Sequence, residues 1–235
     1  MSVFATLVEQ LADLLQPLFH ASAAAAAIVL FTALVRLLVH PLSRAAARGQ
    51  RARAALQPRI AELRKKYRKD PQKLQKAVLE LHAEEKVSPL SGILPSLCQL
   101  PAFFLLYHLF SSSTIGGTGN GLLEHRLFAA PLGGRWADAL AHDGLFGGSG
   151  IVYLGLFAVV AAVATFTFLR TKRSMAGSEP LGGGEQLPGL GAVTKAMPFM
   201  SFFTLVTVAV VPLAAALYVV TSTAWSAVER AVLYR

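Results

Sequence analysis

The sequence predicts an all-α polytopic membrane protein: five transmembrane helices, a cytoplasmic helical hairpin and an N-terminal interfacial amphipathic helix. Of its 235 residues, 54% are hydrophobic and 15% are charged, and the mean hydropathy is +0.52. Such values do not describe a water-soluble domain. The single cysteine, Cys98, excludes a disulfide framework and a Cys-rich zinc site. The composition therefore excludes a soluble enzyme and a disulfide scaffold.

Membrane spans are predicted from the apolar stretches, since about 30 Å of hydrocarbon takes roughly 20 apolar residues to cross as a helix. The expected spans are residues 21–39, 89–110, 151–169, 193–211 and 212–228. The last two belong to one apolar block that is too long for a single span. Pro212 lies near its middle and lacks an amide hydrogen, so we expect a break and a very tight turn there.

The distribution of basic residues predicts the orientation. Segment 40–88 carries 13 of the 22 Lys and Arg residues, and short Lys/Arg-rich loops stay in the cytoplasm. Segment 111–150 has only Arg126 and Arg135, whereas segment 170–192 has Arg170, Lys172 and Arg173. The N-terminus is therefore expected outside and the tail, 229–235, inside. The net charge of +9 thus reports topology, although in a soluble protein it would suggest nucleic acid.

The first 20 residues carry apolar side chains at helical spacing, including Phe4, Val8 and Leu11. Glu9 and Asp13 interrupt the apolar positions and no basic residue precedes them, which argues against a cleaved signal. We expect residues 1–20 to form an amphipathic helix on the outer membrane surface. The alternative is a partly frayed leader without a role.

Segment 40–88 is rich in good helix formers and predicts two helices packed as an antiparallel hairpin. Asp70 and Pro71 separate them, with Asp70 expected as the cap of the second helix and Pro71 as its first residue. The apolar positions of the predicted seam are Leu56, Ile60, Leu63, Tyr67, Leu74, Val78 and Leu81. Its basic surface could face ribosomal RNA, anionic lipid or water, and it lacks the aromatic residues of a sequence-reading RNA module.

Polar residues inside the predicted spans are the candidate functional groups, above all Arg36. A charge in a span usually faces protein or a watery cavity. Alternatively, Arg36 extends its side chain to the inner headgroups. No predicted span contains Asp or Glu, which argues against a proton relay or a cation site. The other polar candidates are Gln99, Thr165, Thr167, Thr204, Thr207, Thr221, Ser222 and Thr223. Each hydroxyl among them could instead bond its own helix backbone.

No catalytic motif stands out. The six histidines lack metal-ligand spacing, and the glycine runs lack the Lys-Ser/Thr of a phosphate loop. We therefore expect no metal, no cofactor and no bond-making chemistry.

Several motifs together resemble the YidC family of membrane protein insertases. The matching stretches are LVRLLVHPL at 34–42, LQPRI at 56–60, KKY at 65–67, DPQKLQ at 70–75, SPLSGILP at 88–95 and QLP at 99–101. A weaker match comprises Met197, Pro198, Pro212, Leu217, Tyr218, Thr221, Ser222 and Trp225. Val219 and Thr223 stand where the family often has Trp and Asn, so any role tied to those side chains is not implied here. The chain looks like a compact bacterial form.

The resemblance implies a five-helix core with a hydrophilic groove open to the cytoplasm and to lipid. Arg36 matches the groove arginine, which attracts acidic parts of nascent membrane proteins; apolar segments leave along the third and fifth spans. The implied groove residues are Arg36, Gln99, Thr165, Thr204, Tyr218 and Thr221. The implied setting is the bacterial plasma membrane, with the ribosome, the Sec translocon and lipids as partners and a monomer as the working unit.

Two alternatives to an insertase remain at this point. A small-solute transporter or channel subunit also needs polar residues in its spans, although membrane carboxylates and inverted repeats are missing from this sequence. A scaffold that only assists the assembly of other membrane proteins would use the same surfaces as an insertase.

Overall fold

The computed structural model describes residues 2–87, 94–115, 117–176 and 197–233. These residues are predominantly helical. The elements are α1 (Ser2–Phe19), η1 (His20–Ser22), α2 (Ala23–Ala55), α3 (Gln57–Lys66), α4 (Pro71–Glu84), α5 (Leu94–Ser111), β1 (Thr114–Ile115), β2 (Thr118–Gly119), η2 (Gly121–Leu123), β3 (Arg126–Leu127), β4 (Ala130–Pro131), α6 (Trp136–Asp143), α7 (Gly148–Ala176), η3 (Met197–Phe202), α9 (Phe203–Val210) and α10 (Leu213–Leu233).

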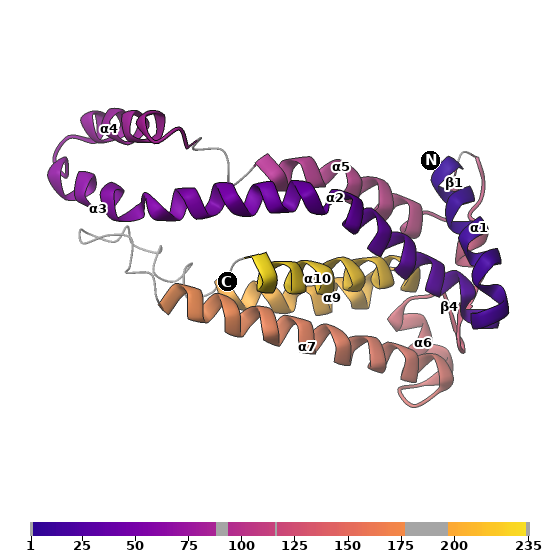
Figure 1. Ribbon diagram of the computed structural model, residues 1–235. Helices are drawn as coiled ribbons and strands as arrows, with labels where there is room; N and C mark the ends of the chain where they lie inside the picture. The colour runs from indigo at the N-terminus through magenta and orange to yellow at the C-terminus, as the bar shows by residue number, and fades with distance from the viewer. Residues whose placement is uncertain (1, 88–93, 116, 177–196, 234–235) are drawn as a thin grey trace.

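The long helices α2, α5, α7 and α10 run along the length of the molecule (Figure 1). At one end lie α3 and α4, which we call the basic end. At the other end lie α6 and two antiparallel two-stranded sheets, β1–β2 and β3–β4, with Thr114 paired to Gly119 and Arg126 to Pro131. We call this the loop end. The basic helices α3 and α4 and the short sheets therefore lie at opposite ends of one helical bundle.

Two stretches of the described chain contain helices long and apolar enough to cross a membrane, one within Val3–Lys66 and the other Gly148–Arg173. Pro198–Val210 is a shorter apolar helical stretch. The predicted spans 21–39 and 151–169 lie within the first two stretches. The total of five spans stays a prediction.

The helix that contains the first predicted span does not end at residue 39. Instead α2 continues as one α-helix from Ala23 to Ala55, with Pro41 inside it. A proline removes one backbone hydrogen bond and bends a helix without ending it where good helix formers flank it. Figure 1 shows α2 bending near its middle. The first span and the first part of the basic segment are thus one helix, rather than a span followed by a separate hairpin arm.

The predicted break at Pro212 is confirmed. α9 ends at Val210, Val211 has an extended backbone, and α10 begins at Leu213. Two helices of the last apolar block are therefore joined by only Val211 and Pro212. The predicted residues 193–196 of this block lie outside the described residues.

The N-terminal segment forms the expected amphipathic helix. In α1, Ala5, Val8 and Ala12 are buried, whereas Leu14 and Leu18 are exposed. The buried side packs on α2, and the ring of Phe4 meets that of Phe31 edge to face at 6.5 Å between centroids. Its location on a membrane surface stays a prediction.

At the basic end, a small apolar cluster joins α3 and α4. Leu56, Ile60 and Leu81 are buried in it, with Leu63, Val78 and Val87 packed against them. The predicted cap is present: Asp70 accepts a hydrogen bond from the backbone N–H of Lys73 at 3.0 Å, and Pro71 opens α4. The side chains of Arg59 and Glu85 form an ion pair. Apolar contacts and a local cap thus hold two short, highly charged helices together.

Candidate functional site

Arg36 on α2 is half-buried and faces α10. Its Nε donates a hydrogen bond to the hydroxyl oxygen of Ser222 at 3.1 Å, and its terminal Nη2 donates to the same oxygen. Ser222 is 6% exposed. A guanidinium carries five N–H donors, so one hydroxyl leaves much of its bonding capacity for other groups. Arg36 is thus held in place by a neutral partner and keeps its positive charge.

Tyr218, one turn before Ser222 on α10, is 2% exposed and forms an aromatic wall beside this pair. Its ring lies 5.9 Å from the rings of both Phe103 and Phe110 of α5. α5 and α10 therefore meet through aromatic contacts next to the arginine. Two of the predicted groove residues, Arg36 on α2 and Tyr218 on α10, therefore lie in this region.

Toward the basic end, α2 and α10 are connected by a second polar contact. The Nδ1–H of His40, one turn after Arg36, donates to Oε1 of Glu229 at 2.6 Å. Further along, the guanidinium of Arg51 donates to the backbone carbonyl of Leu233. Polar side chains thus connect these helices from Arg36 to the basic end.

Toward the loop end the same two helices bury small apolar side chains in one apolar core. Ala24, Ala27 and Ile28 of α2 are buried, as are Ala214 to Ala216 of α10. The free backbone N–H groups at the start of α10 are used as well: Leu213 donates to the carbonyl of Gly134 at 2.9 Å and Ala214 to that of Leu132 at 2.8 Å. The two helices are therefore buried and apolar toward the loop end and connected by polar contacts toward the basic end.

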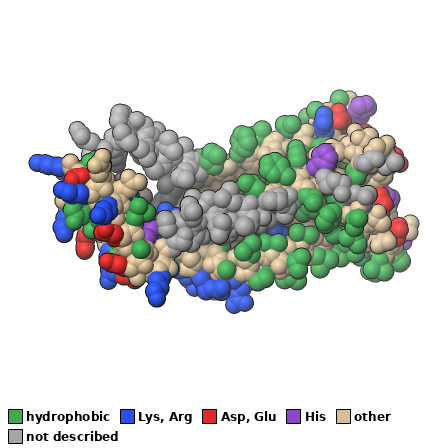
Figure 2. Space-filling model, turned by 90° about the horizontal axis from the view of Figure 1, so that it is seen from above, with side chains coloured by type: hydrophobic (Ala, Val, Ile, Leu, Met, Phe, Trp, Pro, Cys, Tyr) green, Lys and Arg blue, Asp and Glu red, His purple; other side chains and the backbone are tan. Residues whose placement is uncertain are grey.

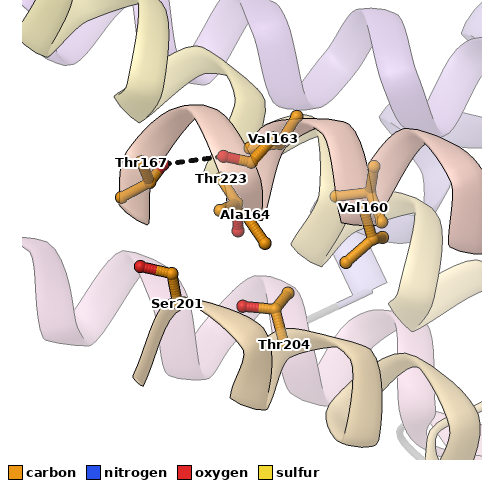
Figure 3. Close-up of a pocket in the computed structure, with 8 residues that line it drawn as sticks. Val160, Val163, Ala164, Thr167, Ser201, Thr204 and Thr223 are labelled. Atoms are coloured by element: carbon orange, nitrogen blue, oxygen red, sulfur yellow. Dashed lines mark hydrogen bonds between the residues drawn. The ribbon is translucent and has the colours of Figure 1, made fainter. Parts of the chain in front are cut away.

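A separate hydroxyl-lined pocket lies between α7, α9 with η3, and α10. Its walls are Val160, Val163, Ala164, Thr167, Ser201, Thr204, Val220 and Thr223. Figure 3 shows Ser201 and Thr204 pointing toward the α7 residues across the pocket. The hydroxyls of Thr167 and Thr223 donate to the backbone carbonyls of Val163 and Val219, at 2.9 and 2.7 Å. These two threonines satisfy their donors within their own helices, as threonines in apolar helices commonly do.

The predicted groove residues that the structure describes thus do not form one continuous site. Arg36 and Tyr218 lie at the interface of α2 with α10 and α5, while Thr204 lines the separate pocket. Thr165 is exposed on α7, and Thr221 is half-buried on α10 but is absent from the pocket lining. The side chain of Gln99 lies outside the described residues.

Sequence reasoning missed three features of the site. It named neither His40 nor Glu229 as a member, and it did not identify Ser222 as the partner of Arg36. Glu229 was assigned to the tail, because apolar residues end at Val228. The helix nevertheless continues to Leu233. A usable signal was the spacing of seven residues between Ser222 and Glu229, which places both on one helix face.

The surface along the bundle is largely apolar. Figure 2 shows hydrophobic side chains along much of the length of the molecule, with Lys and Arg gathered mainly toward one end. The exposed large side chains include Leu34, Leu37, Leu38, Phe104, Ile151, Val159, Phe166, Phe203, Val206 and Val210. Exposed apolar area on this scale marks a surface that is covered by lipid or by another protein. Within the described residues, no group of three His, Cys, Asp or Glu side chains could hold a metal ion.

Long apolar helices, an exposed apolar flank and charge concentrated toward one end define the chain as a helical membrane protein. It belongs to the 60Kd inner membrane protein family, whose model matches residues 15–235. The expected resemblance to the YidC family is therefore confirmed.

Curated relatives carry the name membrane protein insertase YidC. The protein of Clostridium perfringens (strain 13 / Type A) is 44% identical over 87 residues, which are 37% of this chain and 37% of that protein. The protein of Francisella tularensis subsp. novicida (strain U112) is 46% identical over 87 residues, 37% of this chain and 16% of that protein. The matched part thus spans about a third of the first relative (37%) and about a sixth of the second (16%).

Proposed function

We propose that this chain is a membrane protein insertase that uses Arg36 to draw polar parts of its clients into the membrane. The observation that carries the proposal is the position of Arg36, half-buried between two apolar helices and bonded to a hydroxyl instead of a carboxylate. A positive charge with spare donors at such a place attracts anionic groups. Family membership agrees with this function.

The proposed orientation puts the basic end in the cytoplasm of a bacterial cell and the loop end outside the plasma membrane. α2, α5, α7, α9 with η3, and α10 would be the five spans, with α1 on the outer surface. Support comes from the position of 13 of the 22 basic residues in segment 40–88, which forms the latter part of α2 together with α3 and α4.

The proposed groove opens toward the basic end and is closed at the loop end. The buried alanines of α2 and α10 toward the loop end support the closed side, because close packing leaves no room for a polar segment. An acidic client terminus would pass α3 and α4, reach Arg36 and cross the remaining hydrocarbon from there. The charge of Arg36 lowers the cost of placing that terminus inside the bilayer, and this lowers the barrier to crossing.

Apolar client segments would leave along α7 and α10 into lipid. The apolar residues exposed on α7, together with Val228 and Val232 exposed on α10, support this route. The hydroxyl-lined pocket that contains Thr204 lies along it and would hold water or a polar client atom. α9 with η3 is short for a span, and a short span thins the bilayer around it, which further shortens the crossing.

No bond is made or broken in this mechanism. The proposed clients are nascent membrane proteins, delivered by the ribosome or handled together with the Sec translocon. One copy of the chain forms the whole groove.

The test is insertion of a radiolabelled single-span client into liposomes that contain only this protein. The client carries an acidic translocated tail, and a matched client carries Asn and Gln instead. Arg36→Ala is expected to lower insertion of the acidic client by about ten- to a hundredfold, since a charged hydrogen bond is worth about 1.5–3 kcal/mol. Arg36→Lys is expected to retain part of the activity, because it keeps the charge but loses the planar geometry.

The neutral client serves as the internal control and should change little in either variant. Arg44→Ala, which removes an exposed arginine from the same helix α2, is the matched control variant. Equal insertion of the acidic client by wild type and Arg36→Ala contradicts the role of the charge. Insertion no better than in protein-free liposomes contradicts the insertase function itself.

A further inference from the structure

Glu229 is the only carboxylate in the described helices α2, α5, α7, α9 and α10. It lies two turns after Ser222 on α10, on the side that faces α2. Arg36, which donates to Ser222, and His40, which contacts Glu229, are one turn apart on α2. The bundle thus places one carboxylate next to the Arg36 site, on the side toward the basic end.

The carboxylate of Glu229 is held in a defined position. Its side chain is 11% exposed, and Oε1 lies 2.6 Å from Nδ1 of His40, whose side chain is 34% exposed. A carboxylate this well covered usually has a bonded partner, because an unpaired charge away from water is costly. His40 therefore binds Glu229 at a short distance from Arg36 and keeps it from moving freely.

Other charges surround this pair. Glu229 and Arg230 of α10 both interact electrostatically with Arg36 of α2. From α7, the guanidinium of Arg170 donates to the backbone carbonyl of Arg230 at 2.8 Å, which leaves its charge close to the same end of α10. The site thus combines several positive groups with one negative group, instead of being a lone cation.

We propose that Glu229 sets the charge selectivity of the Arg36 site by lowering its affinity for acidic client segments. The carboxylate repels an incoming carboxylate and offsets part of the attraction of Arg36, since both effects act at close range in a medium of low dielectric. The site therefore attracts acidic client segments less strongly than Arg36 would without Glu229. This inference rests on the proposed insertase function.

His40 is expected to act on charge selectivity in the direction opposite to Glu229. The contact with His40 holds the Glu229 carboxylate against α2, one turn from Arg36; without His40 we expect it to approach Arg36 and compensate its charge more fully. Removing the Glu229 carboxylate and removing the His40 side chain that binds it should therefore shift selectivity in opposite directions. A simple mechanical clamp between α2 and α10 predicts the same direction for both, because each change breaks the same contact.

The experiment measures insertion of the acidic client and the neutral client in liposomes containing the full chain, and takes the ratio of the two. Glu229→Gln is expected to raise the acidic-to-neutral ratio by about three- to tenfold. His40→Ala is expected to lower it, and the double variant should behave like Glu229→Gln. Glu85→Gln removes a carboxylate just after α4, where Glu85 pairs with Arg59, and is the matched control.

A direct binding measurement accompanies the insertion assay. A fluorescent acidic peptide and its Asn/Gln counterpart are titrated onto the detergent-solubilised protein, and thermal unfolding confirms that each variant is folded. Tighter binding of the acidic peptide to Glu229→Gln is the expected result. This readout stays informative even if wild-type protein inserts neither client, a result that would contradict only the proposed function.

The inference is overturned if Glu229→Gln leaves both the ratio and the peptide affinity at wild-type values. It is also overturned if Glu229→Gln and His40→Ala change the acidic-to-neutral insertion ratio in the same direction. The His40–Glu229 pair would then act only as a mechanical clamp between α2 and α10.

Discussion

The hydroxyl of Tyr153 donates a hydrogen bond to the backbone carbonyl of Gly134 at 2.6 Å. The same carbonyl accepts from the N–H of Leu213 at 2.9 Å. One carbonyl of the loop end thus connects α7 to the first residue of α10. Tyr153 is buried, and its ring lies 5.6 Å from that of Trp136 in α6. The loop end of the bundle is therefore held together by this shared acceptor as well as by apolar packing.

Tyr153→Phe is expected to lower the free energy of unfolding by about 0.5–1.5 kcal/mol, because the ring stays packed while one buried hydrogen bond is lost. The measurement is denaturant unfolding in detergent micelles. Tyr107→Phe is the control, since it removes a hydroxyl from a half-buried ring stacked on Phe103. Equal losses in the two variants would show that the bond to Gly134 contributes nothing specific.

Ser222→Ala is expected to destabilise the protein by about 1–3 kcal/mol, because it removes an acceptor from a charged donor, Arg36. Ser226→Ala serves as the control: the Ser226 hydroxyl donates to the backbone carbonyl of Ser222 within the same helix. A double-mutant cycle with Arg36→Ala isolates the pair. A coupling energy near zero would show that Arg36 and Ser222 do not stabilise each other.

Asp143 predicts a pH dependence at the start of α7. Hydrogen bonds from the side chain and the backbone N–H of Ser149 lower the pKa of the Asp143 carboxyl below its ordinary value, 3.8. Since the folded pKa is the lower one, this contribution to stability is complete above the ordinary pKa. It is lost as the pH falls through the folded pKa. Asp143 is fully exposed, so the effect is local.

Hydrogen exchange of the first turn of α7 measures this effect. Protection should fall as the pH drops below about 4, and Asp143→Asn should abolish that pH dependence. Glu124→Gln changes an exposed carboxyl elsewhere at the loop end and should leave the dependence intact. An unchanged pH profile in Asp143→Asn would assign the effect to another group.

Features that depend on neighbouring residues in the chain were predictable from sequence. Asp70 caps α4 because the cap bond reaches only three residues ahead, and the apolar block breaks at Pro212 because proline lacks an amide hydrogen. Composition and motifs identified the class and the family. The end of α2 was not predictable in the same way, since Pro41 ends some helices and only bends others.

The partners of the polar residues were decided by tertiary structure alone. Sequence places Thr165 and Thr204 both in apolar segments, yet one is exposed on α7 and the other lines a pocket, because helix packing selects which face is covered. Likewise, sequence singled out Arg36 as a lone intramembrane charge. Only the packing of α2 against α10 gives it Ser222 as a partner and brings Glu229 to its site, since residues 186 positions apart meet there.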